Sequence, residues 1–166
     1  MNEIERCLIA MRARRADFRV VQFSVQGDHI HLFVEAADRD ALARGMQGLA
    51  IRLARGFNRV VDRSGKVWGD RYHARELTTP REVRNGLVYV LMNHKKHGLG
   101  THALDRWSSA LWFDGFEMST QRSVERLRER ALRGGRDSPV SAPRTWLANV
   151  GWRRHGVVGP DERPRL

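Results

Sequence analysis

The sequence predicts an α+β fold in which an antiparallel sheet carries helices on one face and is followed by a helical C-terminal extension. Two adjacent runs rich in β-branched and aromatic residues predict the sheet. Two stretches that repeat apolar residues at helical spacing predict covering helices. The last third is rich in Trp and charge, so we expect one domain over residues 1–104 and a basic, partly helical extension over residues 105–166.

The first 36 residues predict a helix and a hairpin. Ile4, Leu8 and Met11 recur at helical spacing within residues 1–16. The runs "FRVVQFSV" (18–25) and "HIHLFVEA" (29–36) flank a turn that contains Gly27, as in an antiparallel hairpin. Alternation along the second strand would place Ile30, Leu32 and Val34 on one face, and the other face would carry His29, His31, Phe33 and Glu35.

The elements after the hairpin are two long helices with a strand between them. Residues 38–61 carry an apolar helical stripe, residues 66–78 read as a strand region, and residues 80–97 predict a helix. Thr79 would cap that helix, Pro80 would begin it and Gly98 would end it. This order resembles a ferredoxin-like unit, but the strand that would precede the first helix is missing from the predicted order.

The extension predicts a charged helix at 119–134, a linker at 134–143 ("GGRDSPVSAP") and a last short helix within 144–156.

The charge of the chain favours an anionic partner. The formal net charge is +11, and only three of the 30 basic residues are lysine. Arginine suits bidentate contact with phosphate, which favours nucleic acid, although GC-rich coding also produces arginine-rich chains. No run of about 20 apolar residues predicts a membrane span. The single cysteine, Cys7, fits a reducing compartment, so we expect a cytoplasmic protein without a membrane partner.

His29 and His31 are candidate metal ligands. Because side chains alternate along a strand, both imidazoles would lie on one face and a few ångström apart. Neutral imidazoles in that arrangement can chelate a divalent cation. The alternative is a pair of half-exposed histidines without function.

Tyr89 and Asn93 lie four residues apart and therefore share one face of the predicted helix. Asn93 could supply an oxygen ligand beside the Tyr89 phenol, whereas the alternative for Tyr89 is a core aromatic. In the following "NHKKHG", Lys95 and Lys96 are candidate phosphate contacts. His94 and His97 could complete a zinc site with His29 and His31, or belong to a basic last turn that complements the helix dipole.

The stretch "GKVWGDRYHAR" interleaves aromatic and basic residues. Such a pattern suits stacking on unpaired bases and contact with phosphates, so we predict DNA-binding roles for a set of its side chains, which comprises Lys66, Trp68, Arg71 and Arg75. The alternative is an edge strand whose Trp packs on the sheet.

These stretches together resemble the single-tyrosine HUH transposases, and within them the REP-associated tyrosine transposases. The matching segments are "GDHIHLFVE", "FNRVVDRSGKVWGDRYHAREL" and "VRNGLVYVLMNHKKHG", in that order. The resemblance implies a ferredoxin-like enzyme that cuts and rejoins single-stranded DNA near hairpins. It implies metal ligation by His29, His31 and Asn93, and nucleophilic attack by Tyr89. Two nitrogen ligands and one oxygen ligand would suit Mg²⁺ or Mn²⁺.

The sequence departs from that family after the tyrosine helix, where relatives commonly have Asn-Pro and a basic residue but Asn93 is followed by His94. Two alternatives to a transposase-like nuclease remain. One is an inactive or domesticated protein that binds DNA hairpins, and the other is a zinc hydrolase that uses His29, His31, His94 and His97. The sequence also leaves open whether the protein is a monomer or a homodimer.

Overall fold

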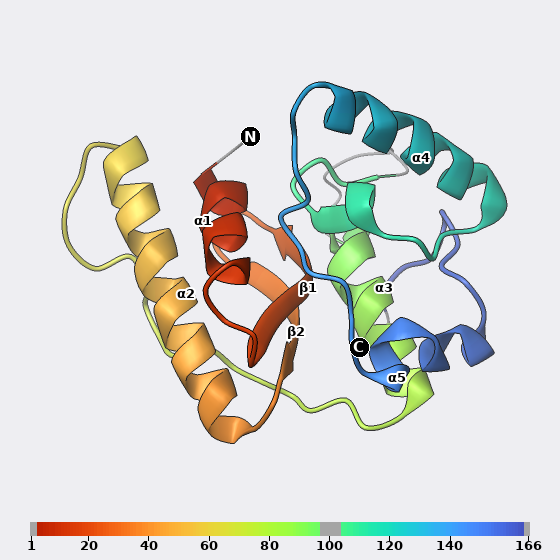
Figure 1. The fold of residues 1–166 in the computed structure, drawn as a ribbon, viewed down its shortest axis with the longest axis horizontal. Helices are drawn as coiled ribbons and strands as arrows, with labels where there is room; N and C mark the ends of the chain where they lie inside the picture. The colour runs from red at the N-terminus through yellow and green to blue at the C-terminus, as the bar shows by residue number, and fades with distance from the viewer. Residues whose placement is uncertain (1–2, 97–103, 165–166) are drawn as a thin grey trace.

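The computed structural model describes residues 3–96 and 104–164, with all of their side chains except that of Lys96. It confirms the α+β class, with one two-stranded antiparallel sheet in the described part of the chain (Figure 1). The elements in chain order are α1 (Glu3–Arg12), β1 (Phe18–Val25), β2 (Ile30–Ala36), α2 (Arg39–Val60), α3 (Pro80–Lys96), the 3-10 helix η1 (Ser109–Trp112), α4 (Met118–Arg133), α5 (Trp146–Asn149) and the 3-10 helix η2 (Gly151–His155).

A β-bulge in β1 sets which residues of the hairpin face which side. Val20 pairs with Val34 and Gln22 pairs with Phe33, so Val21 is the extra residue. The bulge shifts the alternation, so that Phe18, Val20 and Phe23 pack in one hydrophobic cluster and Val21 packs in another. The hairpin therefore has apolar side chains on both faces, and both need a cover.

Helices α1 and α2 cover the first face. Their buried residues pack with Phe18 of β1 and with the three residues of β2 that the predicted alternation placed on one face, which are Ile30, Leu32 and Val34. Helix α2 comes very close to the sheet at Gly45, where an added Cβ would lie 2.2 Å from the ring of Phe18. We call this side the α2 face of the hairpin.

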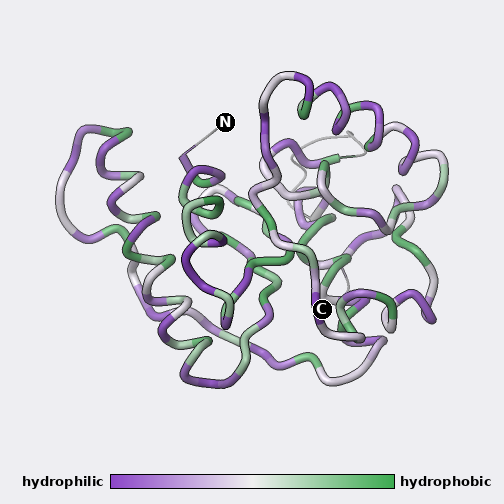
Figure 2. Tube along the Cα trace, viewed as in Figure 1, coloured by the Kyte–Doolittle hydropathy of each residue, from purple (hydrophilic) through white to green (hydrophobic). Residues whose placement is uncertain are grey.

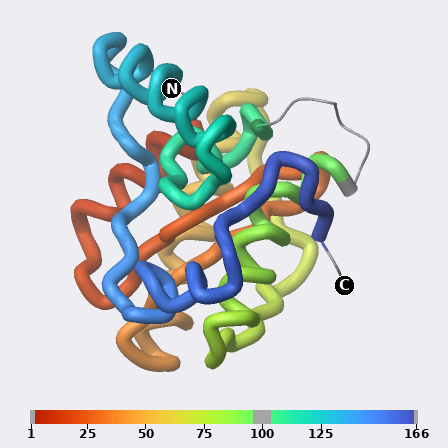
Figure 3. Tube along the Cα trace, turned by 90° about the vertical axis from the view of Figure 1, so that its right-hand side faces the viewer, coloured from red at the N-terminus to blue at the C-terminus, as the bar shows by residue number. Residues whose placement is uncertain are grey.

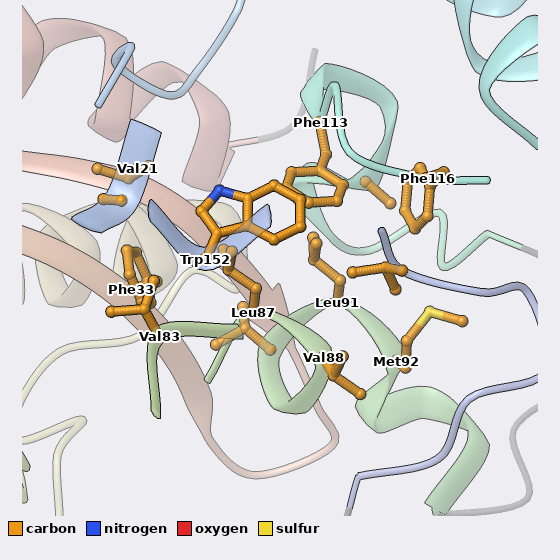
Figure 4. Packing of buried hydrophobic residues seen from close by; sticks show 14 of the residues in the cluster. Val21, Phe33, Val83, Leu87, Val88, Leu91, Met92, Phe113, Phe116 and Trp152 are labelled. Carbon is orange, nitrogen blue, oxygen red and sulfur yellow. The ribbon is translucent and has the colours of Figure 1, made fainter. Parts of the chain in front are cut away.

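Helix α3 covers the opposite face together with the extension. Phe33 of β2 packs with Leu87 and Leu91 of α3, and with Trp152 of η2 (Figure 4). Figure 3 shows the C-terminal segment lying across α3. The expected arrangement of helices on one face thus describes α1 and α2, whereas α3 lies on the second face because that face is also apolar. We call this side the α3 face.

The strand predicted at 66–78 was wrong. These residues form an extended, irregular segment that runs back past α2 toward α3 (Figure 1). Trp68 holds it to α2, since its indole N–H donates to the carbonyl of Ala50 at 2.8 Å and its ring meets Phe57 edge-on. The residues from 69 to 76 are exposed. Aromatic residues favour a strand, but among the described residues this segment has no neighbouring strand with which to form backbone hydrogen bonds.

The predicted linker at 134–143 packs against the first helix and strand. Pro139 and Val140 are buried, and the Ser141 amide donates to the carbonyl of Val20 at 2.8 Å. The buried Glu5 of α1 pairs with Arg136. These long-range contacts could not be predicted from a composition typical of linkers.

The outer edge of β1 is also covered from the extension. The Val25 amide donates to the carbonyl of Trp107 at 2.9 Å, and the Phe23 amide donates to Ser109 Oγ at 2.8 Å. Hydrophobic residues concentrate in the hairpin and in the helix faces turned toward it, whereas α4 is largely hydrophilic (Figure 2). The boundary at residue 104 remains a prediction, and residues on both sides of it share the α3-face cluster.

Candidate active site

The two histidines at the start of β2 face each other. His29 Nε2 and His31 Nε2 lie 2.9 Å apart, and the ring centroids are separated by 4.5 Å at an interplanar angle of 78°. The hairpin turn sets this position, because the Gln26 amide donates to the carbonyl of His29 at 2.9 Å. The period-two spacing thus places two imidazole nitrogens close enough to share one ligand.

Asp28 contacts the far side of the first imidazole. Its Oδ1 lies 2.6 Å from His29 Nδ1, and the His29 side chain is 42% exposed. A carboxylate that accepts a hydrogen bond from Nδ1 favours the tautomer whose lone pair is on Nε2, the atom that faces His31. Sequence reasoning missed Asp28, and its adjacency to His29 is the signal that could have indicated it.

Tyr89 of α3 lies against the second imidazole. The rings of His31 and Tyr89 meet edge-on, with centroids 4.8 Å apart and an interplanar angle of 75°. Tyr89 is half-buried, whereas its neighbours Leu87 and Leu91 are buried in the α3-face cluster. The phenol therefore lies at the edge of the core and beside the histidine pair.

A capping box begins α3 and fixes its direction. The Glu82 amide donates to Thr79 Oγ1 at 3.2 Å, and the Thr79 amide donates to Glu82 Oε2 at 3.1 Å. Hydrogen bonds from the Thr78 amide and from the Thr78 and Thr79 hydroxyls lower the pKa of Glu82 to about 2. The N-cap that the sequence predicted at Thr79 is confirmed.

Asn93 lies one turn after Tyr89 and is 1% exposed. Neither its Oδ1 nor its Nδ2 has a hydrogen-bond partner among the described residues. Leaving such a group unpaired costs about 1–3 kcal/mol, so a buried carboxamide of this kind calls for a reason. A ligand that reaches the carboxamide oxygen would supply one.

The residues present fit a six-coordinate divalent cation. Two ligands about 2.1 Å from one such ion and at right angles lie about 3 Å apart, which is close to the separation of the two Nε2 atoms. Asn93 would add an oxygen, and the remaining positions would stay open to substrate oxygens. The place of Asn93 in the set is inferred from the helix face that it shares with Tyr89, whose ring lies against His31.

The alternative zinc site receives no support from the described residues. Within residues 3–96 and 104–164, no group of three or more His, Cys, Asp and Glu side chains could hold a metal ion. His94 is buried in α3, and His97 lies outside the described residues.

The side chains predicted to bind DNA lie in two regions. Lys66, Arg71 and Arg75 are exposed on the segment between α2 and α3, where Arg75 also contacts Glu82 at 3.2 Å. Trp68 is packed against α2, which favours the packing alternative for this residue. Lys95 is half-buried near the end of α3, and the side chain of Lys96 is outside the described set.

Sequence reasoning also missed two residues near Arg71. Tyr72 is 38% exposed and, with Arg39 of α2, lines a groove beside Arg71. The position of Tyr72 within the basic and aromatic stretch is the signal that could have indicated it.

No helix in the described ranges is long and apolar enough to cross a membrane.

Comparison with known proteins gives one match, to the family described as "Transposase IS200 like" over residues 2–90. No curated protein and no solved structure matches the chain. The matched region begins just before α1 and ends at Val90, one residue after Tyr89, so it includes the histidine pair but not Asn93. Because the match spans more than half of the 166 residues, the chain belongs to the IS200-like transposase family.

Proposed function

We propose that this protein cuts and rejoins single-stranded DNA near hairpins through a covalent bond between Tyr89 and a 5′ phosphate. The observation that carries the proposal is the meeting of His29, His31 and Tyr89 at one place, although they come from two elements. A transposase must break and re-form phosphodiester bonds, and this is the cluster in the described chain that combines a nucleophile with candidate metal ligands.

The metal centre in this proposal consists of Mg²⁺ or Mn²⁺ held by His29, His31 and Asn93. When bound, the ion would polarise the scissile phosphate and stabilise the negative charge that develops on it. Asp28 would keep His29 in the tautomer whose Nε2 faces the ion. The buried Asn93 carboxamide would gain the partner that it lacks within the described residues.

Tyr89 supplies the nucleophile. The Tyr89 oxygen forms a bond to phosphorus while the bond from phosphorus to the 3′ oxygen breaks, and the phenolic proton is transferred, directly or through water, to the leaving 3′ oxygen, which becomes a hydroxyl. Attack by a 3′ hydroxyl on the phosphotyrosine reverses these changes and releases Tyr89. One phosphoester replaces another in each direction, so no ATP is consumed.

The experiment is covalent trapping on a DNA hairpin with a single-stranded flank, in Mn²⁺. We expect an adduct that resists denaturation, and peptide mapping should place it on Tyr89 and not on Tyr72, the only other tyrosine. Tyr89→Phe should give no adduct. Absence of an adduct with the intact protein, or an adduct that persists in Tyr89→Phe, would overturn the proposal.

The metal assignment has its own readout. Mn²⁺ binding followed by calorimetry should weaken about tenfold or more in His31→Ala, because one of three protein ligands is removed. His155→Ala is the matched control, since His155 is exposed at the end of η2 and outside the site. Equal Mn²⁺ affinity in both variants would exclude His31 as a ligand. Hairpin binding without cleavage at any Mn²⁺ concentration would identify the protein as the binding-only alternative.

A further inference from the structure

A groove separate from the tyrosine site lies between the first turn of α2 and residues 71–74. Its volume is about 340 Å³, at the small end of ligand-binding pockets, and it is lined by Arg39, Leu42, Ala43, Arg71, Tyr72 and Ala74. Helix α2 follows the C-terminal end of β2, whereas His29 precedes the N-terminal end. The length of that strand separates the two places by roughly 20 Å.

The groove offers an aromatic ring above an apolar floor. Tyr72 is 38% exposed, and Leu42, Ala43 and Ala74 contribute hydrocarbon surface beside it. Every nucleobase has a π face, and stacking on an exposed aromatic ring is the usual way in which proteins hold an unpaired base. A base in a duplex is stacked on both sides and could not present that face, so the groove suits a single strand.

Two guanidinium groups border the same groove. Arg39 and Arg71 are both exposed, and in the described ranges neither makes a hydrogen bond or an ion pair. The two carboxylates that flank Arg39 in the chain are engaged elsewhere: Asp38 accepts from the Ala41 amide at 2.6 Å, and Asp40 lies 4.0 Å from Arg44. Asp70, which precedes Arg71, is exposed and is not paired with that guanidinium. The two positive charges are therefore available to an anionic ligand such as phosphate.

The wall of the groove is fixed on both sides. On the N-terminal side of residues 71–74, the Trp68 indole donates a hydrogen bond to the Ala50 carbonyl of α2. On the C-terminal side, Arg75 contacts Glu82, which belongs to the capping box of α3. A binding wall that is held in place before the ligand arrives loses less conformational entropy on binding.

We propose that this groove binds one unpaired nucleotide of a DNA single strand, with the base stacked on Tyr72 and the flanking phosphates at Arg39 and Arg71. The choice of DNA as the nucleic acid rests on the proposed function. The stacking and phosphate contacts rest on the groove alone.

The test measures binding of a fluorescein-labelled 12-nucleotide oligo(dT) to the full-length protein by fluorescence anisotropy, in EDTA so that no cleavage occurs. Tyr72→Ala should weaken binding at least fivefold, as expected for loss of one stacked base, whereas Tyr72→Phe should stay within twofold of the unmodified protein. Thermal unfolding of each variant checks that the fold is retained, and Tyr72→Phe keeps the comparison valid because it preserves the ring.

The arginines are tested by the dependence of binding on salt. Arg39→Ala and Arg71→Ala should each reduce the slope of log K against log[salt] by about 0.7, the value for one lost contact with a single-strand phosphate. Arg55→Ala is the matched control, because Arg55 is exposed on the same helix and does not line the groove. It removes the same charge and should leave the slope unchanged.

Three results would overturn the inference. One is that Tyr72→Ala and Arg55→Ala bind oligo(dT) with equal affinity. Another is that Tyr72→Ala weakens binding to a blunt duplex of the same length as much as it weakens binding to oligo(dT). The third is a tenfold preference for oligo(U) that depends on Tyr72, which would assign the groove to RNA. Because the assay contains no metal, its failure is distinct from that of the proposed function: normal trapping on Tyr89 with unaffected binding in Tyr72→Ala would refute the groove alone.

Discussion

The two faces of the hairpin differ in what they bury. The α2 face packs apolar side chains from α1, β1, β2 and α2, and its buried carboxylate, Glu5, is paired with Arg136. The α3 face is equally apolar at Phe33 and Leu87 but also buries Asn93, whose carboxamide has no partner in the described part of the chain. That carboxamide therefore costs the α3 face part of the stability that its apolar contacts provide.

The largest expected effect is on the free energy of unfolding, and it should be similar for a buried leucine on either face. Leu49 on the α2 face is 1% exposed and Leu87 on the α3 face is 2% exposed, so Leu49→Ala and Leu87→Ala should each lower the free energy of unfolding by about 2–5 kcal/mol. Urea denaturation of the two variants measures this. A loss below 1 kcal/mol in one of them would show that its face can collapse around the missing atoms.

The next effect separates the two faces. Asn93→Leu replaces a buried carboxamide that has no partner among the described residues with a side chain of similar volume, so it should raise the free energy of unfolding by about 1–3 kcal/mol without metal. It should also remove most of the rise in Tm that Mn²⁺ produces. Thermal unfolding with and without Mn²⁺ measures both.

Asn149→Leu is the control for that measurement, because Asn149 is exposed at the end of α5 and should change stability by no more than about 0.5 kcal/mol. A destabilised Asn93→Leu that keeps its full response to Mn²⁺ would contradict the ligand role.

The smallest effect lies at the start of α3. The pKa of Glu82 is about 2 in the folded protein and the ordinary value is 4.5, so the folded state binds fewer protons between these values. The contribution of this carboxylate is fully present above pH 4.5 and is lost as the pH falls toward 2. We expect the Tm advantage of the unmodified protein over Glu82→Gln to shrink across that range. A constant difference from pH 6 to pH 2 would exclude Glu82 as the titrating group.

Elements with strong periodicity could be predicted from the sequence, and elements fixed by distant contacts could not. Strand β1 was predicted at 18–25, as found, because that run is rich in β-branched and aromatic residues and is followed by a turn. The segment at 66–78 contains the same kinds of residue, but it does not pair with a strand. Its Trp68 donates a hydrogen bond to the Ala50 carbonyl of α2 instead. The predicted linker at 134–143 is packed because Arg136 meets a carboxylate 131 residues earlier.

In the candidate site, too, the features set by local sequence could be predicted and those set by distant contacts could not. The facing of His29 and His31 follows from the period of a strand and was predictable. The contact between His31 and Tyr89 depends on α3 lying on the second face of the hairpin, which no local pattern encodes. The groove at Tyr72 was missed for the same reason, because half of its wall comes from α2.

The covered outer edge of β1 has a consequence for how the chain can be divided. The family match ends at residue 90, yet the edge is closed by Trp107, Ser109 and Ser141. A chain cut after residue 104 would present a row of unsatisfied amides and carbonyls together with the uncovered apolar stripe of α3. Strands of other molecules can pair with such an edge, and an exposed apolar stripe promotes association. We therefore expect the matched segment to associate with other molecules when it is separated from residues 105–164.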